Sequence, residues 1–153
     1  MPGTTKSVAK SLPDLPCACA SLRRAARLVT QLYSDEMGRD IEPTQFAVLT
    51  ALGFKAGANQ SSIGQALGLD KTTMSRSLRL MQRNGWIEPA LADDGRERGY
   101  RLTEKGERVL VAAKTGWQRA QARLRAGLKP GQWEAMLKAV GQVAEAAVAA
   151  RQG

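Results

Sequence analysis

With 153 residues, the chain is long enough for one domain with a moderate core, or for a small lobe with dimerisation helices, but too short for two domains with independent cores. Its 23 lysines and arginines outnumber 14 acidic residues, and the net charge of +9 favours a polyanionic partner without separating DNA from RNA or an acidic membrane. Histidine is absent, which removes the commonest general base and the commonest zinc ligand, so neither a metal site nor a cofactor is expected.

Targeting signals are also missing from the sequence. It has no apolar run of about 18 residues, and its N-terminus lacks the apolar core of a signal peptide, so nothing points to a membrane or to export. We therefore expect a cytoplasmic protein whose two cysteines are reduced thiols.

The N-terminal third begins with an arm and continues with two helices. Residues 1–16 contain three prolines and several small polar residues, which predicts a mobile arm before a single folded domain of residues 17–153. The first helix is expected from about Leu15 or Cys17 to Met37, where apolar residues recur at helical spacing. A second helix is expected from Pro43, because proline is preorganised for a first helical turn.

A helix, a tight turn and a second helix are expected between Asn59 and Asn84. Asn59 can cap a short helix that ends at Gly68, and Asp70 can cap the next helix, which Gly85 stops. A turn of three or four residues with a glycine joins the two helices of a helix-turn-helix, so this spacing favours a DNA-binding module.

The second helix of this pair has two contrasting faces. Met74, Leu78 and Met81 share one side at about 100° per residue, and that side can pack into a core. Elsewhere the helix is polar and basic, with no acidic residue, so guanidinium groups can reach phosphates or guanine edges and short hydroxyls allow close approach to a major groove. These polar and basic residues are Lys71, Thr72, Thr73, Ser75, Arg76, Arg79 and Arg83. Taken alone, the helix leaves open an ordinary solvated basic face.

Two short strands are expected next, at Trp86–Leu91 and Arg98–Leu102. The Asp-Gly step between them favours a reversing turn, so the pair should form a hairpin. This hairpin would present Arg96 and Arg98 at or near its tip, where cations can enter an adjacent minor groove. Trp86 is expected to pack the hairpin against the helices rather than to stack on bases.

Two long amphipathic helices are expected at the C-terminus. Thr103 can cap the first, which runs from Glu104 towards Gly127, and Pro130 opens the second. Their apolar surface exceeds what a winged lobe of about 50 residues needs to bury. We therefore expect the first helix and the last two to interlock in a symmetric homodimer, which would place two recognition helices on palindromic half-sites about one helical turn apart. A monomeric bundle is the alternative.

Five segments carry a family resemblance. They are Gln60–Leu69, Asp70–Arg76, Asn84–Ile87, Asp94–Arg98 and Leu102–Gly106. In their order and spacing they resemble the MarR family of bacterial transcription regulators, over most of the chain from about Cys17 to the last helix. The resemblance implies a mainly α fold with a small β-hairpin wing, in which a winged helix-turn-helix at about 42–103 adjoins dimerisation helices at about 17–37 and 104–150.

The resemblance also implies DNA contacts. The helix that follows Asp70 should read the major groove, with Thr72, Thr73, Ser75 and Arg76 as base or phosphate contacts. In the wing, Arg96 should enter the minor groove, and Asp94 should orient a wing arginine. The full set of expected DNA-binding residues is Lys71, Thr72, Thr73, Ser75, Arg76, Arg79, Arg96 and Arg98.

Cys17 and Cys19 form a candidate regulatory site. Both lie in or near the first turn of the first helix, where the helix dipole and nearby arginines favour a thiolate. Some MarR-family members that sense organic hydroperoxides carry a reactive cysteine near the start of this helix, so the resemblance implies peroxide oxidation as one route to DNA release. The supporting tyrosines of those sensors are not matched here, since only Tyr33 lies further along the helix. The alternative is that both cysteines pack at a dimer interface.

A second regulatory route that the resemblance implies is a small aromatic or phenolic effector. It would bind between the dimerisation helices and the winged lobe. Arg23, Arg27, Tyr33 and Trp117 are candidate pocket residues, and for each of them a structural or surface role is the alternative.

The sequence is compatible with three functions. The preferred one is a dimeric, sequence-specific regulator, a repressor released by a ligand or by thiol oxidation. A non-specific architectural DNA-binding protein is the alternative, because residues 109–153 carry seven basic and two acidic side chains. The third is a thiol enzyme using Cys17 and Cys19, which without histidine would need an arginine or a helix end to activate the thiolate.

Overall fold

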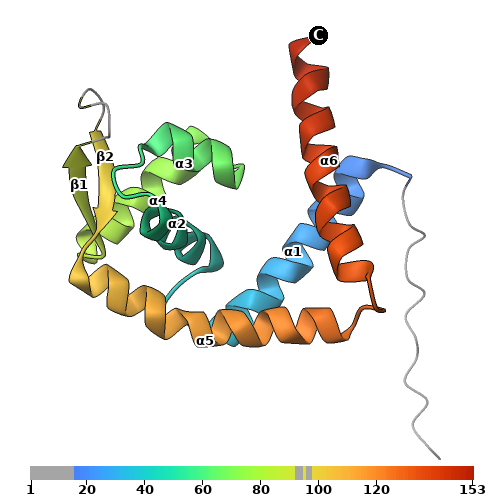
Figure 1. The fold of residues 1–153 in the computed structure, drawn as a ribbon, viewed down its shortest axis with the longest axis horizontal. Helices are drawn as coiled ribbons and strands as arrows, with labels where there is room; N and C mark the ends of the chain where they lie inside the picture. The colour runs from blue at the N-terminus through green and yellow to red at the C-terminus, as the bar shows by residue number, and fades with distance from the viewer. Residues whose placement is uncertain (1–15, 92–94, 96–97) are drawn as a thin grey trace, which may run out of the picture.

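The computed structural model describes residues 16–91, 95 and 98–153. Within these residues the chain forms six helices and one antiparallel hairpin, which confirms the predicted mainly α fold with a small β-hairpin wing. The elements are α1 (Ala18–Met37), α2 (Pro43–Phe54), α3 (Gln60–Leu67), α4 (Lys71–Arg83), β1 (Ile87–Leu91), β2 (Arg98–Leu102), α5 (Glu104–Ala126) and α6 (Gln132–Gln152) (Figure 1). Nearly all of the arm expected at 1–16 lies outside the described residues.

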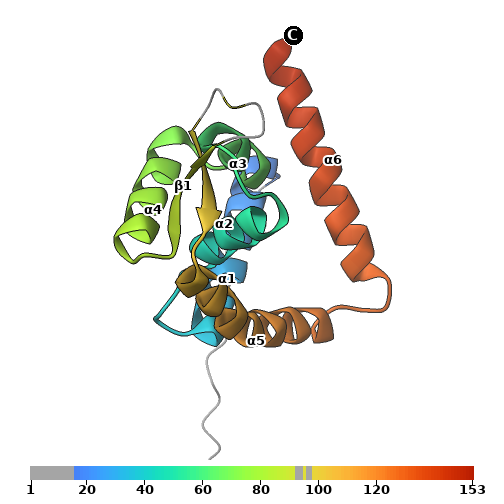
Figure 2. The same cartoon turned by 60° about the vertical axis from the view of Figure 1, so that its left-hand side comes forward.

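The long helix α5 connects two parts of the molecule. The winged lobe, defined as α2, α3, α4, β1 and β2, lies at the N-terminal end of α5, while α1 and α6 rise from its middle and its C-terminal end (Figure 1). From a second direction, α6 again stands apart from the lobe (Figure 2). None of the described helices combines the length and the hydropathy that a membrane span requires.

Three predicted helix caps are confirmed by their hydrogen bonds. The Asn59 side chain accepts from the amide of Ser62 at 2.8 Å, and the Asp70 side chain accepts from the amide of Thr73 at 2.9 Å. Thr103 accepts from the amide of Gly106 at 3.0 Å and also donates to the carbonyl of Gly85 at 2.6 Å. A short polar side chain at each of these positions satisfies a backbone N–H that the first turn leaves unpaired.

Two predicted boundaries were wrong by one or two residues. The first strand begins at Ile87 rather than Trp86, because the Trp86 amide donates to the carbonyl of Met81 and still closes α4. The last helix begins at Gln132 rather than Pro130, because Gly131 adopts a left-handed φ of 80° that no helical residue has.

The hydrophobic core lies in the winged lobe. Its six largest fully buried side chains are Val48, Leu49, Leu52, Met74, Leu78 and Met81, which come from α2 and α4. Trp86 is also buried, as predicted, with 7% of its surface exposed. By contrast, α1 and α6 are described in full and contain no buried residue.

The close crossing of α1 and α5 depends on Gly116. A Cβ at this position would lie 2.6 Å from the carbonyl oxygen of Glu36 and 2.8 Å from the Cα of Met37, so only glycine allows the two backbones to approach so closely. Arg119 donates to that carbonyl at 2.7 Å, and both Arg119 and Arg123 bind the Glu36 carboxylate. The hydrogen bonds from Arg123 and then Arg119 hold the pKa of Glu36 below its ordinary value.

Candidate nucleic-acid interface and effector pocket

The outer face of α4 carries the predicted basic surface. Met74, Leu78 and Met81 are buried in the core, which fixes the opposite side of the helix towards solvent. There Lys71, Thr72, Thr73, Arg76, Arg79 and Arg83 are exposed, while Ser75 is half-buried. The amphipathic division predicted for this helix is therefore correct, and its polar residues form one surface.

A hollow of about 560 Å³ follows this surface and is lined by Arg76, Arg79, Gln82 and Arg83. Three guanidinium groups around one hollow suit an anion such as a phosphate. Gln82 was not expected here, because an uncharged residue does not contribute to a count of basic charges. Its position three residues after Arg79, on the same side of the helix, is the signal that could have identified it.

Two hydrogen bonds from Thr73 to the Asp70 carboxylate stabilise the start of α4. The Thr73 hydroxyl donates to one carboxylate oxygen of Asp70 at 2.5 Å, while the other oxygen accepts from the Thr73 amide. The side-chain hydrogen bond from Thr73, followed by that of its amide, lowers the pKa of Asp70. The hydroxyl proton of Thr73 is therefore already used, which leaves its oxygen and its methyl group to face a ligand.

The hairpin is positioned on the lobe by Gly99. A Cβ here would lie 1.9 Å from the carbonyl oxygen of Gly57, so β2 passes directly against the loop between α2 and α3. Backbone hydrogen bonds on either side secure this contact, from Tyr100 to Ala58 at 3.0 Å and from Gly57 to Tyr100 at 2.8 Å. Sequence reasoning missed this role of Gly99, although a glycine inside a strand often marks a close backbone approach.

The strands of the hairpin pair in a fixed register that places Leu91 opposite Arg98, at the end nearest the connecting turn. Arg98 is exposed there, as predicted. Glu88 and Arg101 form an ion pair across the strands at 2.7 Å. The expected wing residues Arg96 and Asp94 lie outside the described residues.

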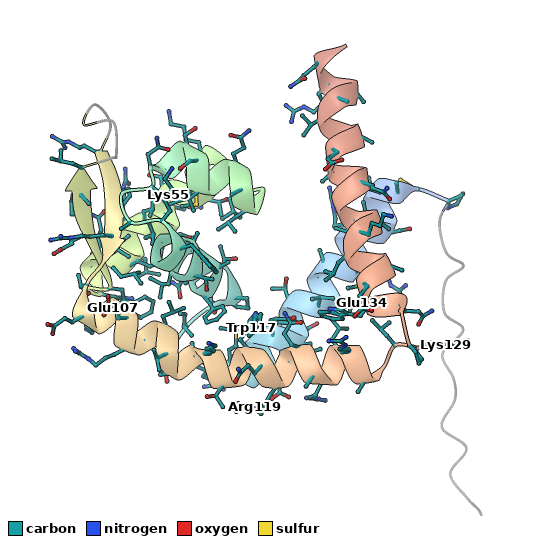
Figure 3. The ribbon with its side chains drawn as sticks, viewed as in Figure 1. Lys55, Glu107, Trp117, Arg119, Lys129 and Glu134 are labelled. Carbon is teal, nitrogen blue, oxygen red and sulfur yellow. The ribbon has the colours of Figure 1, made fainter. Side chains whose placement is uncertain are left out.

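A separate cavity of about 400 Å³ lies where α1, α2 and α5 meet. Its lining includes Tyr33 and Met37 of α1, Phe46 and Thr50 of α2, and Trp117 of α5. Figure 3 places Trp117 on α5 near α1 and α2. Its ring stacks on that of Phe46, with centroids 5.9 Å apart. Two of the four residues predicted for an effector pocket, Tyr33 and Trp117, are therefore together.

The other two predicted pocket residues and the cysteines lie elsewhere. Arg23 and Arg27 are exposed on α1 and are not part of the cavity lining. Cys17 is the N-cap residue of α1 and Cys19 lies in its first turn, so the predicted position of both is correct. Both cysteines are exposed in the single chain and neither forms a disulfide.

Comparison with known proteins identifies the family. A family model for the MarR family matches residues 39–97. The transcriptional regulator HosA of Escherichia coli is 31% identical over 97 residues, which cover 59% of this chain and 72% of that protein. The chain belongs to the MarR family of transcription regulators. The resemblance seen in the sequence is therefore confirmed.

Solved structures of transcription regulators match this MarR-family chain over most of its length. The PcaV regulator from Streptomyces coelicolor, in complex with its natural ligand, has a TM-score of 0.78 and 25% identity, covering 90% of this chain and 99% of PcaV. The M. tuberculosis regulator MosR, in complex with DNA, has a TM-score of 0.77 and 30% identity, covering 88% of this chain and 98% of MosR. A MarR-family member is a DNA-binding regulator rather than an enzyme, which sets aside the thiol-enzyme hypothesis.

Proposed function

We propose that this MarR-family protein is a homodimeric repressor that binds a palindromic operator and releases it when a small aromatic ligand binds. The proposal rests mainly on the exposed basic face of α4. The opposite, apolar face of this helix is buried in the core, and the helix lies next to a hairpin that backbone hydrogen bonds fix to the lobe. The DNA complex of the similar regulator MosR supports duplex DNA as the partner.

In this proposal α4 lies in the major groove. Lys71, Thr72, Thr73, Ser75 and Arg76 belong to its first half and contact bases or nearby phosphates. Arg79, one turn further along, binds the phosphate backbone. The wing adds Arg96 in the minor groove and Arg98 at its base, with Asp94 orienting a wing arginine.

The second copy of the chain binds through α1, α6 and part of α5. Large apolar side chains are exposed on these helices, and burying them in a partner would remove them from water. They are Leu22, Leu28, Val111, Leu137, Val140, Val143 and Val148, each at least 39% exposed. A twofold axis through this interface places two copies of α4 on half-sites about one helical turn apart.

The cavity between α1, α2 and α5 is the effector site of this proposal. It joins helices of the dimer interface to a helix of the winged lobe, so a ligand there can change the angle between them. A small change in that angle alters the spacing of the two α4 helices and weakens binding to a palindrome. The ligand-bound structure of the similar regulator PcaV supports a small-molecule effector.

Thiol oxidation is a second route to release. Cys17 and Cys19 are exposed at the N-terminal end of α1, where a peroxide can reach them. Oxidation to sulfenic acid, followed by a disulfide, would alter the start of a dimerisation helix. A Cys17→Ser, Cys19→Ser variant would keep its operator affinity in peroxide if this route operates.

A selection from a random duplex pool at about 0.15 M salt tests the proposal, because phosphate-only binding is suppressed at this salt concentration. An enriched palindrome is the expected result. Binding without enrichment would instead favour the non-specific architectural function. Repeating the selection with a mild peroxide separates the two release routes, since only thiol oxidation predicts loss of the palindrome.

A further inference from the structure

The cavity between α1, α2 and α5 has an uncharged lining. Among the described residues, no lysine, arginine, aspartate or glutamate contributes to it. The volume of about 400 Å³ is within the range of small-ligand sites and would hold a compound of one to three rings. A carboxylate placed here would lose part of its hydration without gaining a cation from the lining, which is unfavourable.

The charged groups next to the cavity bind one another. Glu36 precedes the lining residue Met37, and Arg119 follows Trp117 by two positions. These two side chains meet at 3.1 Å, and Arg123 binds the same carboxylate. An anionic ligand that recruited one of these arginines would have to compete for it with the Glu36 carboxylate, whose side chain is only 15% exposed.

Two of the lining residues, Thr50 and Tyr33, carry a side-chain hydroxyl. The Thr50 hydroxyl donates to the carbonyl of Phe46 at 2.8 Å, so it can only accept a hydrogen bond from a ligand. The Tyr33 hydroxyl is protonated near neutral pH, where it can donate or accept, and partial burial raises its pKa further above the ordinary value of 10.0. One acceptor and one donor suit a hydroxyl or a carbonyl on the ligand.

Aromatic surface forms the remainder of the recognition site. The Phe46 and Trp117 rings are stacked with an interplanar angle of 30°, and Tyr33 and Phe54, the latter 89% exposed, add two more rings to the lining. Flat ligands gain both burial and ring stacking against such a surface.

We infer that this cavity selects an uncharged, hydroxylated aromatic ligand and rejects the corresponding aromatic carboxylate. The inference rests on the proposed function, in which this cavity receives the effector. Its basis is the uncharged lining of aromatic and hydroxyl-bearing side chains, next to a cluster in which Arg119 and Arg123 both already bind the Glu36 carboxylate.

Calorimetric titration of the full-length protein with 2-naphthol and with 2-naphthoate tests this selection. The two compounds share a ring system, but at pH 7.5 one is neutral and the other is an anion. We expect 2-naphthol to bind at least about tenfold more tightly, a difference of about 1.4 kcal/mol. Equal or tighter binding of the carboxylate, or no binding of either compound up to about 1 mM, would overturn the inference.

The pH dependence provides a second readout. If the site accepts only the neutral acid, the affinity for 2-naphthoate should rise about tenfold for each unit that pH falls towards the carboxyl pKa of about 4, while that for 2-naphthol stays level. A pH-independent affinity for the carboxylate would mean that the anion itself binds.

A substitution that adds a cation should reverse the preference. Phe54→Arg changes an exposed side chain, so the fold should tolerate it, and the new guanidinium should improve 2-naphthoate binding at least about fivefold. Leu91→Arg adds the same charge on the hairpin, at a side chain 81% exposed, and should change neither affinity. No gain in Phe54→Arg would place the ligand outside this cavity. Because these titrations contain no DNA, failure of operator binding would be seen separately, in the duplex selection.

Discussion

The winged lobe and the two helices α1 and α6 differ in how much of their apolar surface a single chain can bury. In the lobe, Val48, Leu49 and Met81 are each fully buried. In α6, Leu137 and Val140 remain 54% and 50% exposed, even though their spacing marks one apolar face. The lobe is therefore stabilised by contacts within the chain, whereas α1 and α6 have apolar surface that the single chain leaves exposed and that the proposed dimer would cover.

The largest expected effect comes from the lobe core. Leu49→Ala should lower the free energy of unfolding by about 2–5 kcal/mol, because the truncated side chain leaves a cavity among buried neighbours. Urea unfolding measures the loss, which should be the same at every protein concentration. Leu91→Ala, at an 81% exposed position, is the control and should cost less than about 0.5 kcal/mol. Similar losses in the two variants would contradict a core centred on α2 and α4.

Placing charges on α6 tests whether its exposed apolar face forms the proposed dimer interface. Leu137→Glu with Val140→Glu should weaken dimerisation about a hundredfold or more, because two carboxylates would be buried in an apolar interface. Sedimentation over a range of concentrations measures this, and the lobe should stay folded by near-ultraviolet circular dichroism. Gln142→Glu places a charge on a different side of the same helix and should leave the dimer intact. A dimer that tolerates the double variant would show that α6 is not the interface.

The basic face of α4, which is proposed to bind DNA, should divide into two functional halves. Arg76→Ala should weaken operator binding by about 1–3 kcal/mol and relax the sequence preference, because Arg76 lies in the half proposed to contact base edges. Arg83→Ala, at the C-terminal end of the same surface, should weaken all duplexes about equally and reduce the salt dependence by about one phosphate contact. Fluorescence anisotropy at several salt concentrations distinguishes the two. If both variants changed affinity, sequence preference and salt dependence equally, the two ends of α4 would not have different functions.

The features that the sequence predicted depend on interactions between residues that are close together in the chain. The caps at Asn59, Asp70 and Thr103 were predicted because each bonds an amide only three residues away. The two faces of α4 were predicted because helical periodicity is local. A periodic stripe also predicted that the C-terminal helices carry more apolar surface than the lobe can bury.

Interactions between distant segments were not predicted. Gly116 in α5 and Gly99 in β2 each touch a backbone far away in the chain, and nothing near a glycine in the sequence specifies which segment will approach it. The binding of Glu36 by arginines 83 and 87 residues later was missed for the same reason. Of the four residues predicted for an effector pocket, Tyr33 and Trp117 do line the cavity between α1, α2 and α5, while the exclusion of Arg23 and Arg27 depends on how α1 crosses α5.

The smallest expected effect concerns the Glu36 cluster, which connects α1 to α5 beside the cavity. Its lowered pKa means that the folded protein holds the carboxylate ionised more strongly than the unfolded chain does, so this stabilisation is fully present above the ordinary pKa of 4.5 and is lost as pH falls through the lowered value. Glu36→Gln should therefore be modestly less stable than the wild type near neutral pH, and the difference should shrink below pH 4.5.

Urea midpoints of both proteins between about pH 7 and about pH 3 measure that convergence. Glu107→Gln removes an exposed carboxylate from α5 and controls for the change in net charge. Because the side chains of Arg119 and Arg123 are 56% and 64% exposed, added salt should also reduce the difference in stability between the wild type and Glu36→Gln. A gap that stays constant with pH would mean that Glu36 does not bind its arginines in solution. The two cations would then be available to an anionic ligand, so this small effect on stability also bears on the selectivity of the neighbouring cavity.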